Sequence, residues 1–298
     1  MKQAFFDGDG RMKRILIIGA VVLAIAAGLI AWRLEPLYLG WLAGKTETAS
    51  LEDRRALIES AAEIHVPETA NGPVPTVLMF HGCAGPRMPF QRQWAEVFND
   101  AGFGAIIIDS TGPRGYARED ALEIVCAGKA LLGQERAGDV LAAIEIARTD
   151  PRLDADHLIL AGWSHGAWTV MDFLTMDADK RRPAGLSGDL PTTPEIDGVI
   201  LFYPHCGTGA LSRLRPWRQS PPSIAFVAGA DTIVDSKKCI ALIDRMKSRG
   251  TDIDMVVYPD AEHVFDDPYL EAEWRNWYNE ADHKDAERRL KAYLAGRG

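Results

Sequence analysis

Short, continuous runs of apolar residues recur along most of the chain, and segments with a helical pattern separate them. Strands that are covered on both faces are apolar throughout. The alternation of the two element types predicts an α/β fold, in which helices flank a mostly parallel central sheet. The expected strands are 76–80, 104–109, 157–162, 198–203, 223–229 and 253–258, and the expected helices are 91–102, 135–149, 166–176, 237–250 and 285–296.

One segment has a different period. Residues 56–66 alternate between apolar and polar positions, which predicts an edge strand with one face in water. The chain shows no internal repeat and no low-complexity tract. We therefore expect a single α/β domain over residues 51–298, a length that one such sheet can reach.

The longest apolar run, residues 15–32, contains no charged residue. As a helix it would be about 27 Å long, close to the hydrocarbon thickness of a bilayer. Basic residues are denser before this run than after it. The bias predicts that residues 1–14 form a cytoplasmic tail, that 15–32 form a transmembrane signal-anchor helix, and that 33–50 form a tether.

The same run also fits a second interpretation. The small residues Ala24 and Ala26 flank Ile25 in the form that signal peptidases cleave. A signal-anchor helix is favoured, because the apolar run continues past this point to Trp32. In either case the main domain is expected outside the cytoplasm, in the periplasm or beyond.

Charge and cysteine content restrict the expected binding partners and cellular compartment. The net charge is −9, so binding to nucleic acid is not expected, because it needs a basic field. The four cysteines, Cys83, Cys126, Cys206 and Cys239, fit an oxidising compartment and allow three full pairings. No Cys-x-x-Cys or His-x-x-His spacing occurs, and we expect no metal or cofactor.

The stretch "LILAGWSHGAW", residues 158–168, carries the main chemical signal. An expected strand ends at Gly162, Ser164 follows, and an expected helix begins at Gly166. This Gly-x-Ser-x-Gly pattern between a strand and a helix is typical of a nucleophile held on a strained turn. Glycine on either side avoids the clash that a larger side chain would cause there.

A serine nucleophile needs a base, and the base needs a carboxylate to orient it. In this strand–turn–helix arrangement the chain order is serine, acid, histidine. His263 follows the strand at 253–258, whereas His283 lies in a charged stretch that we expect to be solvated. Asp231 directly follows the strand at 223–229 and is preferred to Asp235, which fits a helix N-cap. The expected triad is Ser164, Asp231 and His263.

Acyl transfer also needs donors for the oxyanion. We expect the backbone N–H of His165, directly after the nucleophile, to be one of them. The other is assigned to the backbone of Cys83, in the small-residue loop "HGCAG" (81–85) that follows the strand at 76–80. The thiol of Cys83 is not expected to act as a nucleophile, because no base is assigned to it.

Four stretches, "FHGCAGPR", "IIIDSTGPRGY", "GWSHGAW" and "AEHVFDD", resemble the dienelactone hydrolase family of the α/β-hydrolase superfamily. The resemblance covers roughly residues 55–295, in order. It implies the α/β-hydrolase fold, a nucleophile–acid–histidine triad at Ser164, Asp231 and His263, and hydrolysis of an ester, lactone or related acyl bond. Family members proper use a cysteine nucleophile, so the serine here favours a serine esterase over a dienelactone hydrolase.

The expected function is thus a membrane-anchored serine hydrolase that acts on a small-molecule ester or lactone through an acyl-enzyme. Two alternatives stay open. One is a serine peptidase or acyltransferase on the same fold, because the acyl-enzyme can pass its acyl group to different acceptors. The other is a catalytically silent module that serves as a binding protein or scaffold, against which the complete set of catalytic residues argues.

Some residues have weaker claims to a role in substrate binding. Arg114, and Arg213, Arg215 and Trp217 in the loop 204–222, are candidates for recognising an anionic part of the substrate. That loop follows the strand after which lids are inserted in the superfamily. An ion pair for Arg114 and a solvated basic loop are the alternatives. Trp274 and Trp277 are expected to serve in packing or at a membrane surface.

Overall fold

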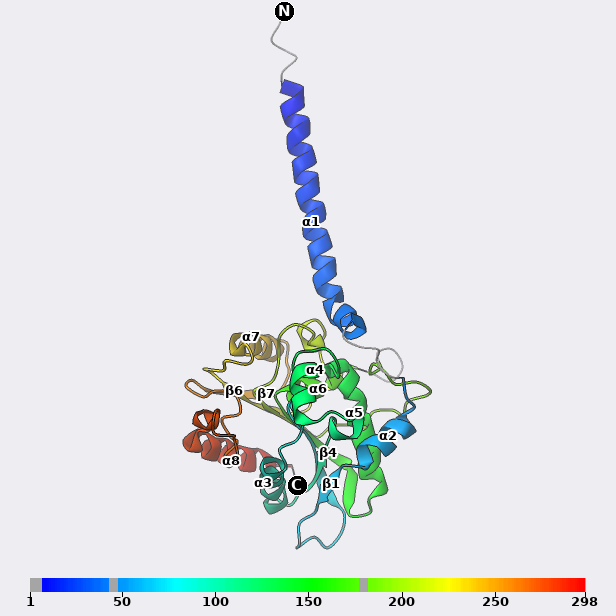
Figure 1. Ribbon diagram of the computed structural model, residues 1–298, viewed down its shortest axis with the longest axis vertical. Helices are drawn as coiled ribbons and strands as arrows, with labels where there is room; N and C mark the ends of the chain where they lie inside the picture. Colours follow the sequence, from blue (N-terminus) through cyan, green and yellow to red (C-terminus); the bar gives the residue numbers. More distant parts are fainter. Residues whose placement is uncertain (1–6, 43–47, 177–181, 298) are drawn as a thin grey trace, which may run out of the picture.

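The computed structural model describes residues 7–42, 48–176 and 182–297. Helix α1 (Asp7–Leu42) extends away from an α/β body (Figure 1). The side chains described in it, those of residues 13–30, are exposed, and this window is apolar and long enough to cross a membrane by length and composition. The helix thus includes the first ten residues of the predicted tether, and residues 43–47 of that tether lie outside the described residues.

The body contains a seven-stranded sheet in the order β1-β3-β2-β4-β5-β6-β7. All neighbouring strands are parallel except β1, which pairs antiparallel with β3 at one edge. The mostly parallel sheet flanked by helices confirms the expected fold class. The strands are β1 (Glu63–His65), β2 (Val74–Phe80), β3 (Gly104–Ile108), β4 (Leu153–Trp163), β5 (Gly198–Phe202), β6 (Ser223–Ala228) and β7 (Ile253–Tyr258).

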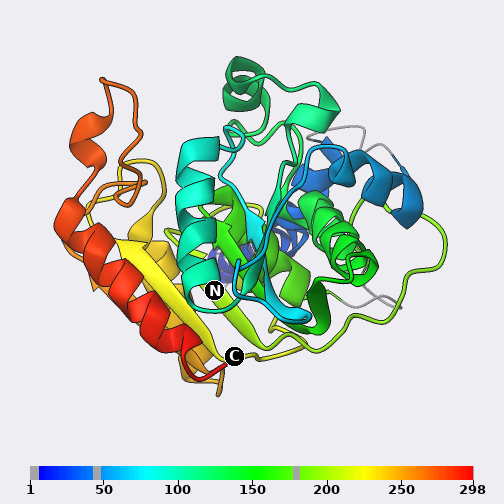
Figure 2. The same ribbon diagram turned by 90° about the horizontal axis from the view of Figure 1, so that it is seen from below.

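The helices form two layers that bury the two faces of this sheet, as the view in Figure 2 shows from below. Alternation along β2 illustrates the arrangement: Val77 and Met79 pack with one layer, and Leu78 and Phe80 pack with the other. Helices α3 (Met88–Asp100) and α8 (Glu280–Leu294) contribute to the first layer. Helices α2 (Leu51–Glu59), α5 (Gly133–Thr149), α6 (His165–Leu174) and α7 (Ser236–Lys247) contribute to the second.

The sequence analysis misjudged two segments. The edge strand predicted at 56–66 is wrong for most of its length, because residues 51–59 form α2 and only β1 is extended. Ser50 caps that helix by accepting a hydrogen bond from the backbone N–H of Asp53 at 3.0 Å. The short helix α4 (Arg118–Ile124) was not predicted. This helix forms one wall of a cavity beside Ser164.

Candidate active site

Ser164 lies on a sharp turn between β4 and α6. Its backbone has φ 54° and ψ −113°, a left-handed conformation that costs free energy for a residue with a side chain. The two flanking glycines make the turn possible. A Cβ atom at Gly166 would overlap the carbonyl oxygen of Phe80, and one at Gly162 would lie 2.5 Å from the backbone nitrogen of Ala167. The turn thus requires glycine at both positions, as the motif predicts.

The structure brings Ser164, His263 and Asp231 into one hydrogen-bonded chain. Ser164 Oγ lies 2.9 Å from His263 Nε2, and His263 Nδ1 lies 2.7 Å from Asp231 Oδ2. The Asp231 side chain is 1% exposed, and its second oxygen accepts from the backbone N–H groups of Ile233 and Val234. This geometry can remove a proton from a serine hydroxyl and stabilise the resulting imidazolium.

Asp235 has no part in this chain. It is half exposed, lies at the N-cap position of α7, and pairs with Lys238 at 3.3 Å. His283 differs from its expected environment: it is buried, and its Nδ1 lies 2.6 Å from the backbone carbonyl oxygen of Asp266. The expectation of a solvated His283 was therefore wrong, since α8 turns this residue towards the core despite its charged neighbours.

The buried carboxyl group of Asp266, three residues after His263, binds side chains that lie next to His263 and Ser164. It accepts hydrogen bonds from the hydroxyl of Tyr203 at 2.8 Å and from the indole nitrogens of Trp94 and Trp163, each at 3.1 Å. Burial raises the pKa of Asp266 to about 7. Trp163 precedes Ser164, and the Tyr203 ring packs 4.7 Å from the His263 ring, so this carboxyl group fixes neighbours of both residues. The sequence analysis did not identify it.

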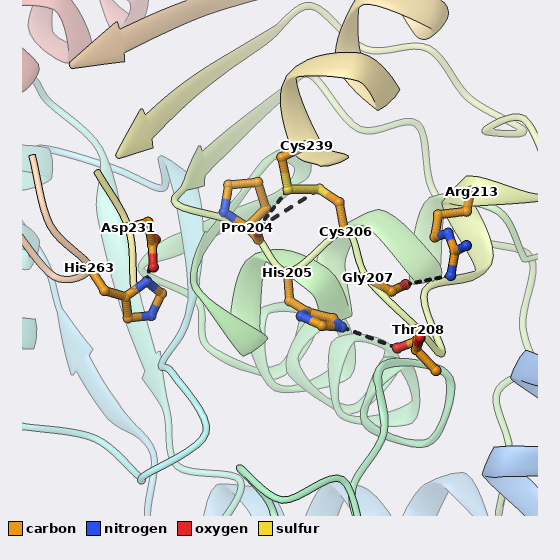
Figure 3. Close-up of a disulfide and its surroundings, with 9 residues drawn as sticks. All are labelled: Pro204, His205, Cys206, Gly207, Thr208, Arg213, Asp231, Cys239 and His263. Atoms are coloured by element: carbon orange, nitrogen blue, oxygen red, sulfur yellow. Dashed lines mark hydrogen bonds and ion pairs between the residues drawn. A yellow bond between two sulfur atoms is a disulfide. The ribbon is translucent and has the colours of Figure 1, made fainter. Parts of the chain in front are cut away.

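Figure 3 shows the surroundings of His263 and Asp231 on the side of β5. The loop after this strand carries Cys206, which forms a disulfide with Cys239 of α7. His205 points away from His263 and lies 3.1 Å from the carbonyl oxygen of Thr208. The bridge thus ties the loop after β5 to the helix that follows the loop of Asp231.

The second disulfide joins Cys83 to Cys126. It connects the loop 81–85, which we call the oxyanion loop, to the segment after α4. The two observed bridges select one of the three pairings left open by the sequence, and the described residues include no free cysteine. Cys83 therefore has no thiol that could act as a nucleophile.

A cavity of about 290 Å³ opens beside Ser164 and His263. The oxyanion loop, α4 and the segment between β7 and α8 provide its walls, and in Figure 2 the latter two protrude on the same side of the molecule. Its lining is mainly apolar and includes Trp274 and Trp277, whose rings stack at 5.7 Å. The other apolar side chains on it are Phe90, Leu122, Trp163, Ile233, Val264 and Leu270.

A set of buried polar residues, here called the polar layer, lies behind the oxyanion loop and contributes nothing to the cavity lining. Arg136 is at its centre and donates to the backbone carbonyl of His81 at 2.7 Å and to the hydroxyl of Ser110 at 2.8 Å. It also lies 3.3 Å from His165 Nδ1. The polar layer consists of Arg54, His81, Ser110, Arg114, Arg136, Asp139 and His165.

The one carboxylate of the polar layer, Asp139, pairs with two of its three arginines. Asp139 accepts from Arg54 at 3.0 Å and from Arg114 at 2.7 Å. Burial opposes ionisation of Asp139, but the two arginines outweigh it and lower its pKa. Burial and the Arg136 charge lower the pKa of His81 to about 4 and that of His165 well below its usual range. Both imidazoles are therefore neutral near pH 7.

None of the four residues predicted to bind substrate lines the cavity. Arg114 is mostly buried, with 13% of its side chain exposed, and forms an ion pair with Asp139, because the turn after β3 directs it inward. Arg213 donates to the carbonyl of Gly207 at 3.1 Å and lies beyond His205 as seen from His263 (Figure 3). Trp217 is part of the hydrophobic core, and Arg215 follows Arg213 in the same loop. The structure corrects these assignments.

The sequence matches the model of the dienelactone hydrolase family over residues 61–296. The chain belongs to the dienelactone hydrolase family. It is thus an esterase-like hydrolase with the α/β-hydrolase fold, as the motifs predict. The chain has Ser164 at the turn between β4 and α6.

Solved structures with this fold include an esterase and a dienelactone hydrolase-like phosphotriesterase, both similar to this chain. One is a thermophilic esterase from Thermogutta terrifontis with propionate bound, which is 16% identical and has a TM-score of 0.57, covering 80% of this chain and 89% of that one. Another is a dienelactone hydrolase-like promiscuous phosphotriesterase from metagenomic libraries, at 17% identity and a TM-score of 0.55, covering 79% and 92%. At these identities the likeness shows the fold alone.

More distant similarity extends to peptidases. The human acylamino-acid-releasing enzyme is 22% identical over 228 residues, which is 67% of this chain and 30% of that protein. The chain therefore matches less than a third of the length of this curated relative.

Proposed function

We propose that the protein is a serine hydrolase that cleaves a small ester, lactone or related acyl bond through an acyl-enzyme. The chain of hydrogen bonds from Ser164 through His263 to Asp231 carries this proposal. His263 Nε2 takes the hydroxyl proton as Ser164 Oγ attacks the carbonyl carbon, and Asp231 stabilises the imidazolium. The imidazolium then protonates the leaving alcohol, and water attacks the acyl-enzyme by the reverse proton path to release the acid.

Two backbone N–H groups are proposed to stabilise the oxyanion of the tetrahedral intermediate. His165 is the first residue of α6, where the backbone N–H groups have no acceptor within the helix. Cys83 lies on the cavity wall with Ser164. The hydrogen bond from Arg136 to the His81 carbonyl and the Cys83–Cys126 bridge both hold the oxyanion loop near the nucleophile.

A covalent probe tests the proposal directly. A fluorophosphonate should label Ser164 in the full-length, detergent-solubilised wild type, and neither Ser164→Ala nor His263→Ala should be labelled. Loss of either residue is expected to reduce kcat by several orders of magnitude, about 10⁶ in the best-studied enzyme of this type. His157→Ala is the matched control, because this histidine is exposed and pairs with Asp197. A folded wild type that takes no label would favour the silent scaffold.

The acid assignment has its own test. Asp231→Asn should reduce kcat on an activated ester by about 10⁴, the loss seen when a triad aspartate is neutralised in a serine protease. Asp235→Asn should leave kcat nearly unchanged, because that side chain is exposed and paired with Lys238. Equal losses in the two variants would contradict the role of Asp231.

Similarity to an acylamino-acid-releasing enzyme favours a second candidate, a serine peptidase on the same site. Cleavage of an N-acyl amino-acid amide at a rate comparable with that of the matching ester would support it. Acyl transfer to an alcohol acceptor would be detected in the same assay as a product ester.

We also propose that α1 anchors the catalytic domain, residues 51–298, to a membrane from outside the cytoplasm. The exposed apolar window Lys13–Ile30 supports the anchor, and two disulfides support an oxidising compartment. Signal cleavage is the alternative. Alkaline-phosphatase and fluorescent-protein fusions after residue 50 report the side, and the mass of the mature chain reports cleavage. Fluorescence without phosphatase activity would reverse the topology.

A further inference from the structure

The cavity beside Ser164 contains charged groups, but they neutralise one another. Arg87 donates to Asp267 and to Glu271, both at 2.9 Å. Arg118, at the start of α4, lies 3.5 Å from the other oxygen of Glu271. Two cations thus share two carboxylates, and Glu271 links α4 to the segment that follows His263.

The remaining wall offers no positive charge to a substrate. It is formed by the apolar side chains that line the cavity, by Ser164, Tyr203 and His263, and by the oxyanion loop, whose polar groups are backbone amides. Gln91 also lines it: this side chain is 2% exposed, and its Oε1 atom has no hydrogen-bond partner among the described residues. A buried acceptor oxygen attracts an N–H or O–H group and repels a carboxylate.

From this charge balance we infer that the site takes neutral esters with an apolar group in the cavity and discriminates against esters that carry a free carboxylate. The inference rests on the proposed function and names its substrate class. An anionic group in this cavity would lose its hydration and would have to compete with Asp267 and Glu271 for Arg87 and Arg118. Burial of an uncompensated charge is costly, whereas burial of apolar surface is favourable.

The first experiment compares three esters on the full-length, detergent-solubilised enzyme. Phenyl butyrate is neutral, phenyl hydrogen succinate carries a carboxylate on the acyl side, and 4-carboxyphenyl butyrate carries one on the alcohol side. We expect kcat/KM to be at least about tenfold lower for one of the two anionic esters than for phenyl butyrate, because the cavity takes either the acyl group or the alcohol group of the ester. A desolvation penalty of about 1.4 kcal/mol already corresponds to a tenfold decrease.

The outcomes separate this inference from the proposed function. If both anionic esters match or exceed phenyl butyrate, the inference is overturned while the hydrolase stands. It is also overturned if the fluorophosphonate labels Ser164 but none of the three esters is turned over. If labelling and turnover are both absent, the proposed function itself is wrong.

A second experiment changes the charge of the cavity. Glu271→Gln leaves Arg87 with Asp267 and removes the carboxylate that pairs with Arg118, so the ratio of kcat/KM for phenyl butyrate to kcat/KM for the disfavoured anionic ester should shrink several-fold. Glu273→Gln is the matched control, since it makes the same substitution at an exposed position two residues away, whereas Arg87 and Arg118 pair with Glu271. An equal ratio in the two variants would contradict the role of the paired charges.

Discussion

The cavity and the polar layer meet at the same stretch of chain, the oxyanion loop, yet they are built from opposite chemistry. Residues 82–85 face a mainly apolar cavity, where the few charged side chains are paired with one another. His81, one residue earlier, is held by Arg136 and Ser110 within a largely buried set of charges and hydrogen bonds. Removal of one partner of a buried ion pair strongly lowers the free energy of unfolding, because the other charge stays buried without compensation. An apolar wall tolerates changes in the size of its side chains. The polar layer therefore fixes the loop, and the cavity is where substrate preference can vary.

Removal of the central carboxylate of the polar layer should have the largest effect on stability. Asp139→Asn leaves the buried guanidinium groups of Arg54 and Arg114 without their counter-charge, so the free energy of unfolding should fall by about 3–5 kcal/mol. Denaturant titration measures it. Asp150→Asn is the matched control, because its pair with the exposed Arg152 is expected to contribute at most about 1 kcal/mol. Equal losses would show that the polar layer is not a structural centre.

Loss of the bridge at the boundary between the two regions should come next. The double variant Cys83→Ser, Cys126→Ser opens a loop closed across 43 positions and should lower the free energy of unfolding by about 2–4 kcal/mol. It should also lower kcat, because the oxyanion loop and the α4 wall are no longer joined. Cys206→Ser with Cys239→Ser opens a loop of similar length and is the control for stability. An unchanged kcat in the first variant would separate the bridge from the site.

A smaller, pH-dependent effect is expected at Asp266. Its pKa in the folded protein, about 7, is above the ordinary value of 3.8, so the folded state retains a proton that the unfolded state releases. The stabilisation from this proton is complete below about pH 4 and is lost as the pH rises through 7. The free energy of unfolding of wild type relative to Asp266→Asn should therefore decrease from pH 5 to pH 8. A constant difference would show that Asp266 is ionised throughout.

The smallest effect on stability is expected on the cavity side. Leu122 is 38% exposed on α4, and Leu122→Ala should change the free energy of unfolding by less than about 1 kcal/mol. Its effect should appear instead in the ratio of kcat/KM values for butyrate and longer acyl esters, because it enlarges the cavity. A loss of stability as large as that of Asp139→Asn would remove the contrast between the two regions.

Local patterns predicted the fold and the sharp turn at Ser164. The six parallel strands β2–β7 and the turn at Ser164 depend on residues adjacent in sequence, and the chain order of the superfamily restricts the acid and the base. Residues 56–66 show the limit: their alternation misled because residues 51–59 form α2, whose Arg54 pairs with Asp139, 85 positions away. The cavity wall was missed for the same reason. Leu122 and Trp277 come from segments that only the tertiary fold brings together, and no local period marks them.

The two disulfides also have a topological consequence. Between Cys83 and Cys126 the chain contains α3, β3 and α4, and between Cys206 and Cys239 it contains β6 and the loop of Asp231. Each bridge therefore closes a covalent ring around elements that shape the site. A protease that cuts once inside either ring produces a nick but no free fragment, so the severed ends stay attached to the same molecule and can remain in place.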